Sequence, residues 1–151
     1  MRIVQYMLGF GSRDGGVVRA LVDLSNALAA RGHTVTAMTT DDSDAPRNWD
    51  GQDGRPLLET LAFSGLPIPL LSRRSLNRAH QLIVEADVVH LHVPWDPICV
   101  QLAGLCLRMN KPYIVTVHGM LDDWTMQQGS LKKRAYLFLM GRRMLEGAAV
   151  V

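Results

Sequence analysis

The sequence lacks a long apolar run and a strong excess of either charge. No stretch approaches the ~18 apolar residues that a membrane span needs, and the short apolar run after Arg2 has no small-residue cleavage site of a signal peptide. Sixteen Lys and Arg face 14 Asp and Glu, a net charge of +2, which is too small a bias for whole-surface nucleic-acid binding. We expect a soluble protein, or one that at most lies on a membrane surface.

Cysteine is also scarce, because Cys99 and Cys106 are the only two in the sequence. On one helix, seven residues would place them about 10 Å apart along the axis, too far for a disulfide. We therefore expect buried, reduced thiols, as in a reducing cytoplasm. A chain of 151 residues, 48% apolar and 20% charged, suffices for one domain without a disulfide or metal staple.

Segments with the patterns of strands and helices alternate along the chain, without internal repeats or low-complexity segments. Strands are predicted at residues 1–8, 33–40, 57–63, 88–93 and 112–117, with a sixth beginning at 147–151, and helices at 17–31, 72–85, 97–109 and 130–145. Residues 41–56 are acidic and aperiodic, which predicts a solvated loop. This alternation predicts an α/β fold with a mostly parallel sheet, whose ligands bind beyond the carboxyl ends of the strands.

The glycine-rich loop after the first strand opens a helix. Its free backbone N–H groups and the positive end of the helix dipole suit a phosphate or carboxylate, and Gly15 and Gly16 would let that anion approach closely. The match to the dinucleotide motif G-x-G-x-x-G is poor, because Asp14 stands at the third glycine and would repel a pyrophosphate. Asp41, at the place of a ribose-binding acid, lies among other loop acids. Anion binding, a plain turn that Asp14 caps, and nicotinamide binding remain as alternatives.

Three histidines lie at or near the ends of the fourth and fifth predicted strands. His118, next to Gly119, follows the fifth strand, where it can hydrogen-bond a substrate hydroxyl, act as an acid or base, or merely cap the strand. His90 and His92 alternate along the fourth strand and so face the same side. The spacing supplies no third metal ligand, so no metal site is predicted. We expect His90 to pack within the sheet and His92 to be exposed beside Trp95.

Two further segments allow a functional and a structural interpretation. Asp122, Asp123 and Trp124 are suited to binding a polyol, but equally to an ordinary turn and helix start. The helix at 130–145 carries basic residues in its first turn, against the helix dipole, and near its end. It is either a solvated basic face over a packed apolar face, or a contact for an anionic membrane surface or a phosphorylated acceptor. These basic residues are Lys132, Lys133, Arg134, Arg142 and Arg143.

Taken together, these segments resemble the N-terminal half of the group 1 (family 4) glycosyltransferases. The resemblance rests on the order and spacing of MRIVQYM, GGVVR, LSNALAARGHTVTAMTT, ADVVHLHVPW, KPYIVTVHGMLDDW and LKKRAYLFL. It implies one Rossmann-like, doubly wound domain of the two that form a GT-B fold. It also implies transfer of a sugar from a nucleotide-diphosphate sugar to an acceptor with retention of configuration, without a bound metal or other cofactor.

The resemblance also implies roles for individual residues. His118 would contact the donor sugar near the reacting centre, and the basic helix would lie near the rim of the cleft or a membrane surface. The donor would also be bound by Gly15, Gly16, Arg19 and Gly119; the acceptor by His92, Trp95, Met120, Asp122, Asp123 and Trp124; and a phosphate or membrane surface by Lys132, Lys133 and Arg134.

The sequence departs from the family pattern in one large respect. The family's second domain binds most of the nucleotide and carries paired glutamates, whereas this chain has only Glu59, Glu85 and Glu146. We expect residues 1–151 to be a lone N-terminal domain that is inactive by itself, and that associates with copies of itself through its exposed sheet edge. Its expected partners are a nucleotide sugar and an unknown acceptor, without nucleic acid, in the cytoplasm or at the inner face of the membrane. A non-catalytic nucleotide- or sugar-phosphate-binding module and a nicotinamide oxidoreductase are the rival interpretations.

Overall fold

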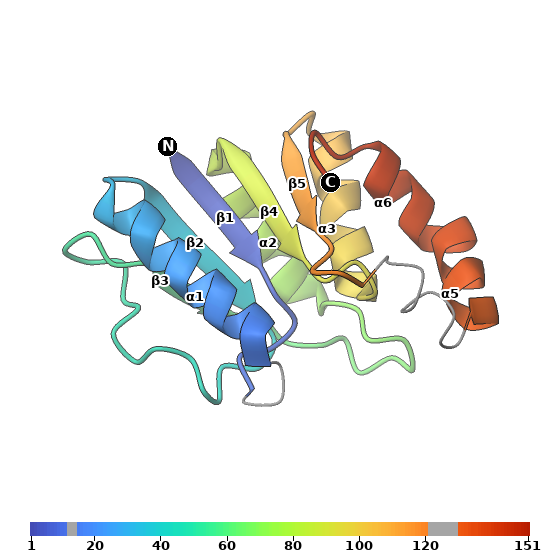
Figure 1. The fold of residues 1–151 in the computed structure, drawn as a ribbon, viewed down its shortest axis with the longest axis horizontal. Helices are drawn as coiled ribbons and strands as arrows, with labels where there is room; N and C mark the ends of the chain where they lie inside the picture. The colour runs from blue at the N-terminus through green and yellow to red at the C-terminus, as the bar shows by residue number, and fades with distance from the viewer. Residues whose placement is uncertain (12–14, 121–129) are drawn as a thin grey trace.

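The fold is a parallel sheet with helices on both faces (Figure 1). The computed structural model describes residues 1–11, 15–120 and 130–151, without the side chains of Ser130 and Lys132. The elements are β1 (Arg2–Tyr6), α1 (Gly15–Ala30), β2 (Thr34–Thr39), β3 (Leu57–Thr60), α2 (Arg73–Glu85), β4 (Val88–His92), α3 (Pro97–Arg108), β5 (Tyr113–Thr116), α5 (Ser130–Tyr136), a π-helical turn (Leu137–Gly141) and α6 (Arg142–Glu146).

The five strands run in the order β3-β2-β1-β4-β5, and every pair is parallel. The chain builds outward from β1 to β3 on one side, then crosses back to β4 and continues to β5 on the other. The strand order therefore reverses between β1 and β4, where doubly wound folds leave a crevice beyond the carboxyl ends of the strands. The predicted α/β class and parallel sheet are confirmed.

The two faces of the sheet are covered differently. Figure 1 shows α1 on one face, over β1 and β2, and α2 and α3 on the opposite face. The larger core lies under α2 and α3 and contains Val89 and Leu91, the inward residues of β4. Cys99 and Cys106 belong to this core as buried free thiols, which confirms their prediction.

Local sequence signals explain where the helices on this face begin. Ser72 caps α2 by accepting a hydrogen bond from the backbone of Ser75. Asp96 caps α3 in the same way from Ile98, and Pro97 occupies its first turn, where no N–H is needed. α3 begins only a few residues after β4 ends, which places its cap, Asp96, near the end of that strand.

The loop at 41–56 is not fully solvated, contrary to the prediction. Trp49 is buried in the smaller core under α1, where its ring packs edge-on against Phe10. Its indole N–H donates a 3.0 Å hydrogen bond to Asn26 on α1. The apolar area of one tryptophan is enough to fold this acidic loop back onto the α1 face.

The C-terminal segment agrees with its prediction in part. Residues 130–146 are helical as expected, but the turn Leu137–Gly141 is π-helical. Residues 147–151 do begin to pair with β5, because Val150 bridges Ile114 in parallel and the backbone N–H of Val115 donates to the carbonyl of Val150 at 3.0 Å.

The apolar side chains of this helical segment are not all packed. Leu131, Phe138 and Leu139 are 85%, 77% and 75% exposed, so the first of the two alternatives for this helix, a packed apolar face, does not hold at these positions. Of the helices that the structure describes, none combines the length and apolar character that crossing a bilayer requires.

Candidate functional site

The histidines of β4 and the segment after β5 meet at the point where the strand order reverses. Gln5 of β1 is beside His90 in register, and His92 is beside Thr116 of β5. In parallel strands, residues aligned in this way point to the same face. Gln5, His90, His92 and Thr116 therefore form one polar row across three strands, and His90 shares a 2.7 Å hydrogen bond with the Thr116 hydroxyl.

His118 lies two residues beyond β5, in a conformation that side chains rarely adopt. Its φ is +46°, and Gly119 follows with φ +74°. Val93, directly after β4, has φ +69°, which is exceptional for a β-branched residue. Two adjacent strands thus end in strained backbone, a feature that clusters at functional sites. No sequence pattern predicts the strain at Val93.

His92 is buried, at 2% exposure, so the expectation that it is exposed at the cleft is wrong. Its Nδ1 lies 3.0 Å from Nε2 of His118, and its Nε2 lies 3.3 Å from Oε1 of Gln5. The planes of the His92 and His118 rings are 20° apart, with centroids separated by 5.3 Å. His92 is therefore buried between Gln5 and His118 and forms hydrogen bonds with both.

The burial of these rings disfavours their charged forms. Desolvation, together with the neighbouring histidines, lowers the pKa of His92 to about 3. Desolvation and His118 lower the pKa of His90 to about 4, and desolvation lowers the pKa of the partly buried His118. All three shifts favour the neutral form of the ring at pH 7, and a neutral imidazole offers one donor and one acceptor.

A second polar pair lies at the same end of the sheet, on the α3 side. The hydroxyl of Tyr6 donates a 2.6 Å hydrogen bond to Oδ2 of the buried Asp96. Desolvation raises the pKa of Asp96, although this bond and the capping bond from Ile98 oppose the shift. The thiol of Cys99 donates to the backbone carbonyl of His92. These contacts connect the ends of β1 and β4 to the start of α3.

Gln5, Tyr6 and Asp96 also belong to this site, and none of the three was predicted from the sequence. Gln5 is a polar residue in an otherwise apolar strand that precedes the glycine loop, and Asp96-Pro97 is a helix-start signal. Both signals were visible in the sequence. Only the strand order, however, places β1 beside β4.

Trp95 joins the site to α5. Its ring lies 5.7 Å from that of Tyr136, and the Lys133 ammonium lies 5.6 Å from the Trp95 centroid. Among the described residues, four buried side-chain polar atoms have no hydrogen-bond partner, and three of them belong to this region: the indole nitrogen of Trp95, the hydroxyl of Tyr136 and the side-chain nitrogen of Gln5. Tyr136 was also missed, and its place on a basic amphipathic helix gave no signal for it.

The glycine loop lies at the same edge of the sheet. Gly15 and Gly16 begin α1 and are exposed, and no described atom lies within 4 Å of a Cβ built at either position. Gly15 has φ +45°, which favours glycine. Arg19, on the next turn, is exposed and forms a 3.7 Å ion pair with Asp23.

Some of the predicted site residues lie outside the described part of the chain. They are Asp14, Asp122, Asp123 and Trp124, together with the side chain of Lys132. Met120 is partly buried, and its backbone N–H donates to Val117 at 2.8 Å. The His90–His92 pair acquires no further ligand among the described residues, which contain no cluster of three or more His, Cys, Asp or Glu suited to a metal ion.

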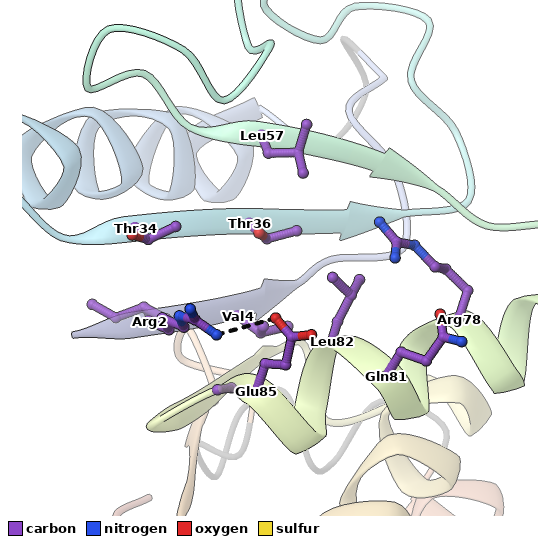
Figure 2. A pocket seen from close by; sticks show the side chains of 11 residues that line it. Arg2, Val4, Thr34, Thr36, Leu57, Arg78, Gln81, Leu82 and Glu85 are labelled. Atoms are coloured by element: carbon purple, nitrogen blue, oxygen red, sulfur yellow. Dashed lines mark hydrogen bonds and ion pairs between the residues drawn. The ribbon is translucent and has the colours of Figure 1, made fainter.

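A hollow of about 580 Å³ lies elsewhere, in the amino-terminal half of the sheet. Figure 2 shows Arg78, Leu82 and Glu85 of α2 on one side of it, and Thr34, Thr36 and Leu57 of β2 and β3 on the other. Glu85 is ion-paired with Arg2 at 3.1 Å. Because it lies away from the carboxyl ends of the strands, this hollow is not part of the candidate site.

The strand order, the helices on both faces of the sheet and the polar residues at the carboxyl ends of the strands define a Rossmann-like α/β domain. Residues 14–151 match the family model described as Glycosyltransferase Family 4, and the chain belongs to this family. No curated protein matches the sequence. The chain is a glycosyltransferase-like domain, as the sequence predicted.

Solved structures agree with this assignment at the level of the fold. HepE (Alr3699) from Anabaena, solved with UDP and glucose, is 15% identical with a TM-score of 0.58, over 89% of this chain and 34% of HepE. This chain thus spans about a third of HepE. A short-chain dehydrogenase/reductase from Veillonella parvula, solved with NADP, is 14% identical with a TM-score of 0.53, over 93% of this chain and 64% of that protein. These likenesses show the fold alone.

Proposed function

We propose that the chain is the N-terminal, acceptor-side domain of a two-domain GT-B glycosyltransferase. The enzyme moves a sugar from a nucleotide-diphosphate sugar to an acceptor with retention of configuration. The family match over residues 14–151 supports this reaction class, and the similarity to HepE, which is solved with UDP and glucose, supports a nucleotide-sugar donor. In this proposal a second domain binds most of the nucleotide, so residues 1–151 do not turn over alone.

The observation that supports the proposal most strongly is the way in which His118 is held at the end of β5. Its left-handed backbone and its hydrogen bond to a buried histidine hold its ring at the end of β5. A neutral imidazole there can accept a hydrogen bond from a sugar hydroxyl and position the anomeric carbon without acting as the nucleophile. Gly119 leaves the adjacent backbone without a side chain.

The remaining proposed roles follow from where the residues lie around the carboxyl ends of the strands. Gly15 and Gly16 present free N–H groups at the start of α1, where a diphosphate is favoured, and Arg19 lies on the next turn. Trp95 and Met120 contact the acceptor, together with Asp122, Asp123 and Trp124. Lys133 and Arg134 are placed at the rim on α5, with Lys132 in the same turn.

Turnover by the full-length protein that carries this domain tests the proposal. His118→Ala should lower the transfer rate by roughly 10²-fold or more with little change in melting temperature, because a partly buried ring contributes little core packing. His80→Ala, on the exposed side of α2, is the matched control and should leave both unchanged. A near-normal rate with a lowered melting temperature would show that His118 only caps the strand.

The rival function is a nucleotide- or sugar-phosphate-binding module without chemistry. The fold shared with the NADP-bound dehydrogenase also keeps nicotinamide binding as an alternative to test. Product analysis by NMR separates these functions. Transfer with retained anomeric configuration supports the proposal, whereas binding of nucleotide sugars without transfer by the full-length protein supports the module.

We further propose a cytoplasmic protein that contacts the inner face of the membrane through α5 and the π-helical turn. Leu131, Phe138 and Leu139 are exposed on this segment, and Arg134 is exposed between them. Apolar side chains flanked by cations favour an anionic membrane surface.

A further inference from the structure

His92 has a property that its expected role as an acceptor contact does not explain. It ends β4 at 2% exposure, and Gln5 beside it is fully buried, yet both are polar. Burial of a polar side chain is costly unless it is hydrogen-bonded. The two bonds of the His92 ring connect buried Gln5 at one end to partly exposed His118 at the other.

The direction of these bonds follows from the acceptor at the buried end. The Gln5 amide is oriented with Oε1, which can only accept, toward His92; with this orientation Nε2 of His92 carries the proton and donates to it. In a neutral ring, Nδ1 of His92 is then an acceptor. Nε2 of His118 must donate to it, which leaves Nδ1 of His118 as the acceptor of that ring.

The surroundings keep this arrangement neutral. Among the described residues, the titratable groups whose rings lie against His92 are His90 on its own strand, at 4.0 Å between ring centroids, and His118 after β5. Tyr6 of β1 is hydrogen-bonded to Asp96, and Cys99 of α3 donates to the backbone of His92 rather than to its ring. Burial and the two flanking histidines oppose a charge on His92, with a pKa of about 3.

We propose that His92, held by Gln5, is a positioning residue that fixes His118 as the neutral tautomer with its proton on Nε2. The ring of His118 thereby keeps its Nδ1 lone pair for a hydroxyl of the bound sugar. The inference rests on the proposed function for its consequence in turnover, but the tautomer itself is a property of the protein without substrate.

Two variants of His92 separate positioning from packing. His92→Phe keeps a ring of similar size in the core but offers no acceptor. His92→Asn offers a side-chain oxygen close to the place of Nδ1. Gln5→Leu removes the acceptor at the buried end and serves as an independent variant if His92→Phe does not fold.

Long-range ¹H–¹⁵N NMR of the histidine rings in residues 1–151 reads the tautomer directly at pH 7. We expect protonated Nε2 and unprotonated Nδ1 at His118 in the wild type, a mixture of tautomers in His92→Phe and Gln5→Leu, and the wild-type pattern in His92→Asn. A wild-type His118 protonated on Nδ1, or a tautomer unchanged by His92→Phe, would overturn the inference.

Turnover of the full-length protein provides the second measurement. His92→Phe should lower kcat by roughly 10- to 100-fold, as misplacement of a reacting group does, and His92→Asn should recover most of it. If the tautomer responds as expected while His118→Ala retains its rate, the proposed role of His118 fails and the positioning contact stands. If kcat falls equally in His92→Phe and His92→Asn, His92 acts through packing and the inference fails.

Discussion

The hydroxyl of Tyr6 donates a 2.6 Å hydrogen bond to Asp96, which is 90 residues away in the sequence. Tyr6 ends β1 and Asp96 caps the start of α3, so the bond spans the reversal point of the sheet. Both side chains are buried. Removing the donor leaves a buried carboxylate without its partner, which costs more than the hydrogen bond contributes.

Tyr6→Phe should therefore lower the free energy of unfolding by about 1–3 kcal/mol. Urea unfolding at pH 7 measures the change. Tyr136→Phe is the matched control, because its buried hydroxyl has no hydrogen-bond partner among the described residues, and it should change stability far less. An equal loss in the two variants would contradict the importance of the Tyr6–Asp96 pair.

Stability should fall as the pH is lowered from about 6.5. His90 and His92 have folded-state pKa values of about 4 and about 3, below their ordinary value of 6.5. Between these pKa values and pH 6.5, the unfolded chain therefore binds protons at the two histidines that the folded chain does not bind. Within this pH range, each ring should lower the free energy of unfolding by about 1.4 kcal/mol for each unit by which the pH falls. The raised pKa of Asp96 acts in the opposite direction, just above its ordinary value of 3.8.

His92→Asn should make this pH dependence shallower by about 1.4 kcal/mol per pH unit between pH 6.5 and 5. Unfolding curves at a series of pH values give the slope. His80→Gln removes an exposed histidine of α2 instead and should preserve the slope. A His92→Asn protein with the wild-type slope would show that His92 does not resist protonation.

Gly16→Ala should weaken donor binding without destabilising the fold. No described atom lies within 4 Å of its added Cβ, and alanine is the better helix former, but the methyl group would stand where the diphosphate approaches. We expect residues 1–151 to bind nucleotide sugars with millimolar Kd, about −4 kcal/mol, and Gly16→Ala to bind several-fold more weakly in NMR titrations.

Gly104→Ala on α3 is the matched control for Gly16→Ala, since the added methyl group meets only the end of Arg108 at 3.6 Å. It should bind nucleotide sugars as the wild type does. Micromolar binding of a nicotinamide cofactor in calorimetry would contradict the donor assignment and favour the oxidoreductase interpretation.

The exposed side chains of Phe138 and Leu139 should mediate binding to anionic vesicles. Phe138→Ser and Arg134→Glu should each reduce co-sedimentation with phosphatidylglycerol vesicles several-fold, whereas Leu66→Ser, an exposed apolar residue outside this segment, should not. Dimers in sedimentation velocity that Phe138→Ser abolishes, without vesicle binding by the wild type, would show instead that this surface contacts a second copy of the chain.

The alternation of β-branched runs and helical periodicity predicted most elements, because these patterns reflect burial on one local face. Ser72 and Asp96 cap α2 and α3 for a reason that is equally local: side-chain oxygens satisfy free N–H groups. The π-helical turn and the exposure of Phe138 could not be predicted, because the same amphipathic pattern fits a packed α-helix.

The sequence by itself determined the α/β class, the position of the glycine loop, the family resemblance and the common face of His90 and His92. These follow from chain-local geometry, in which side chains alternate along a strand. Only the tertiary structure decided that His92 is buried between Gln5 and His118, and that Tyr6 meets Asp96. Those contacts depend on β4 lying beside β1, a strand order set by packing across the whole sheet, which no local pattern encodes.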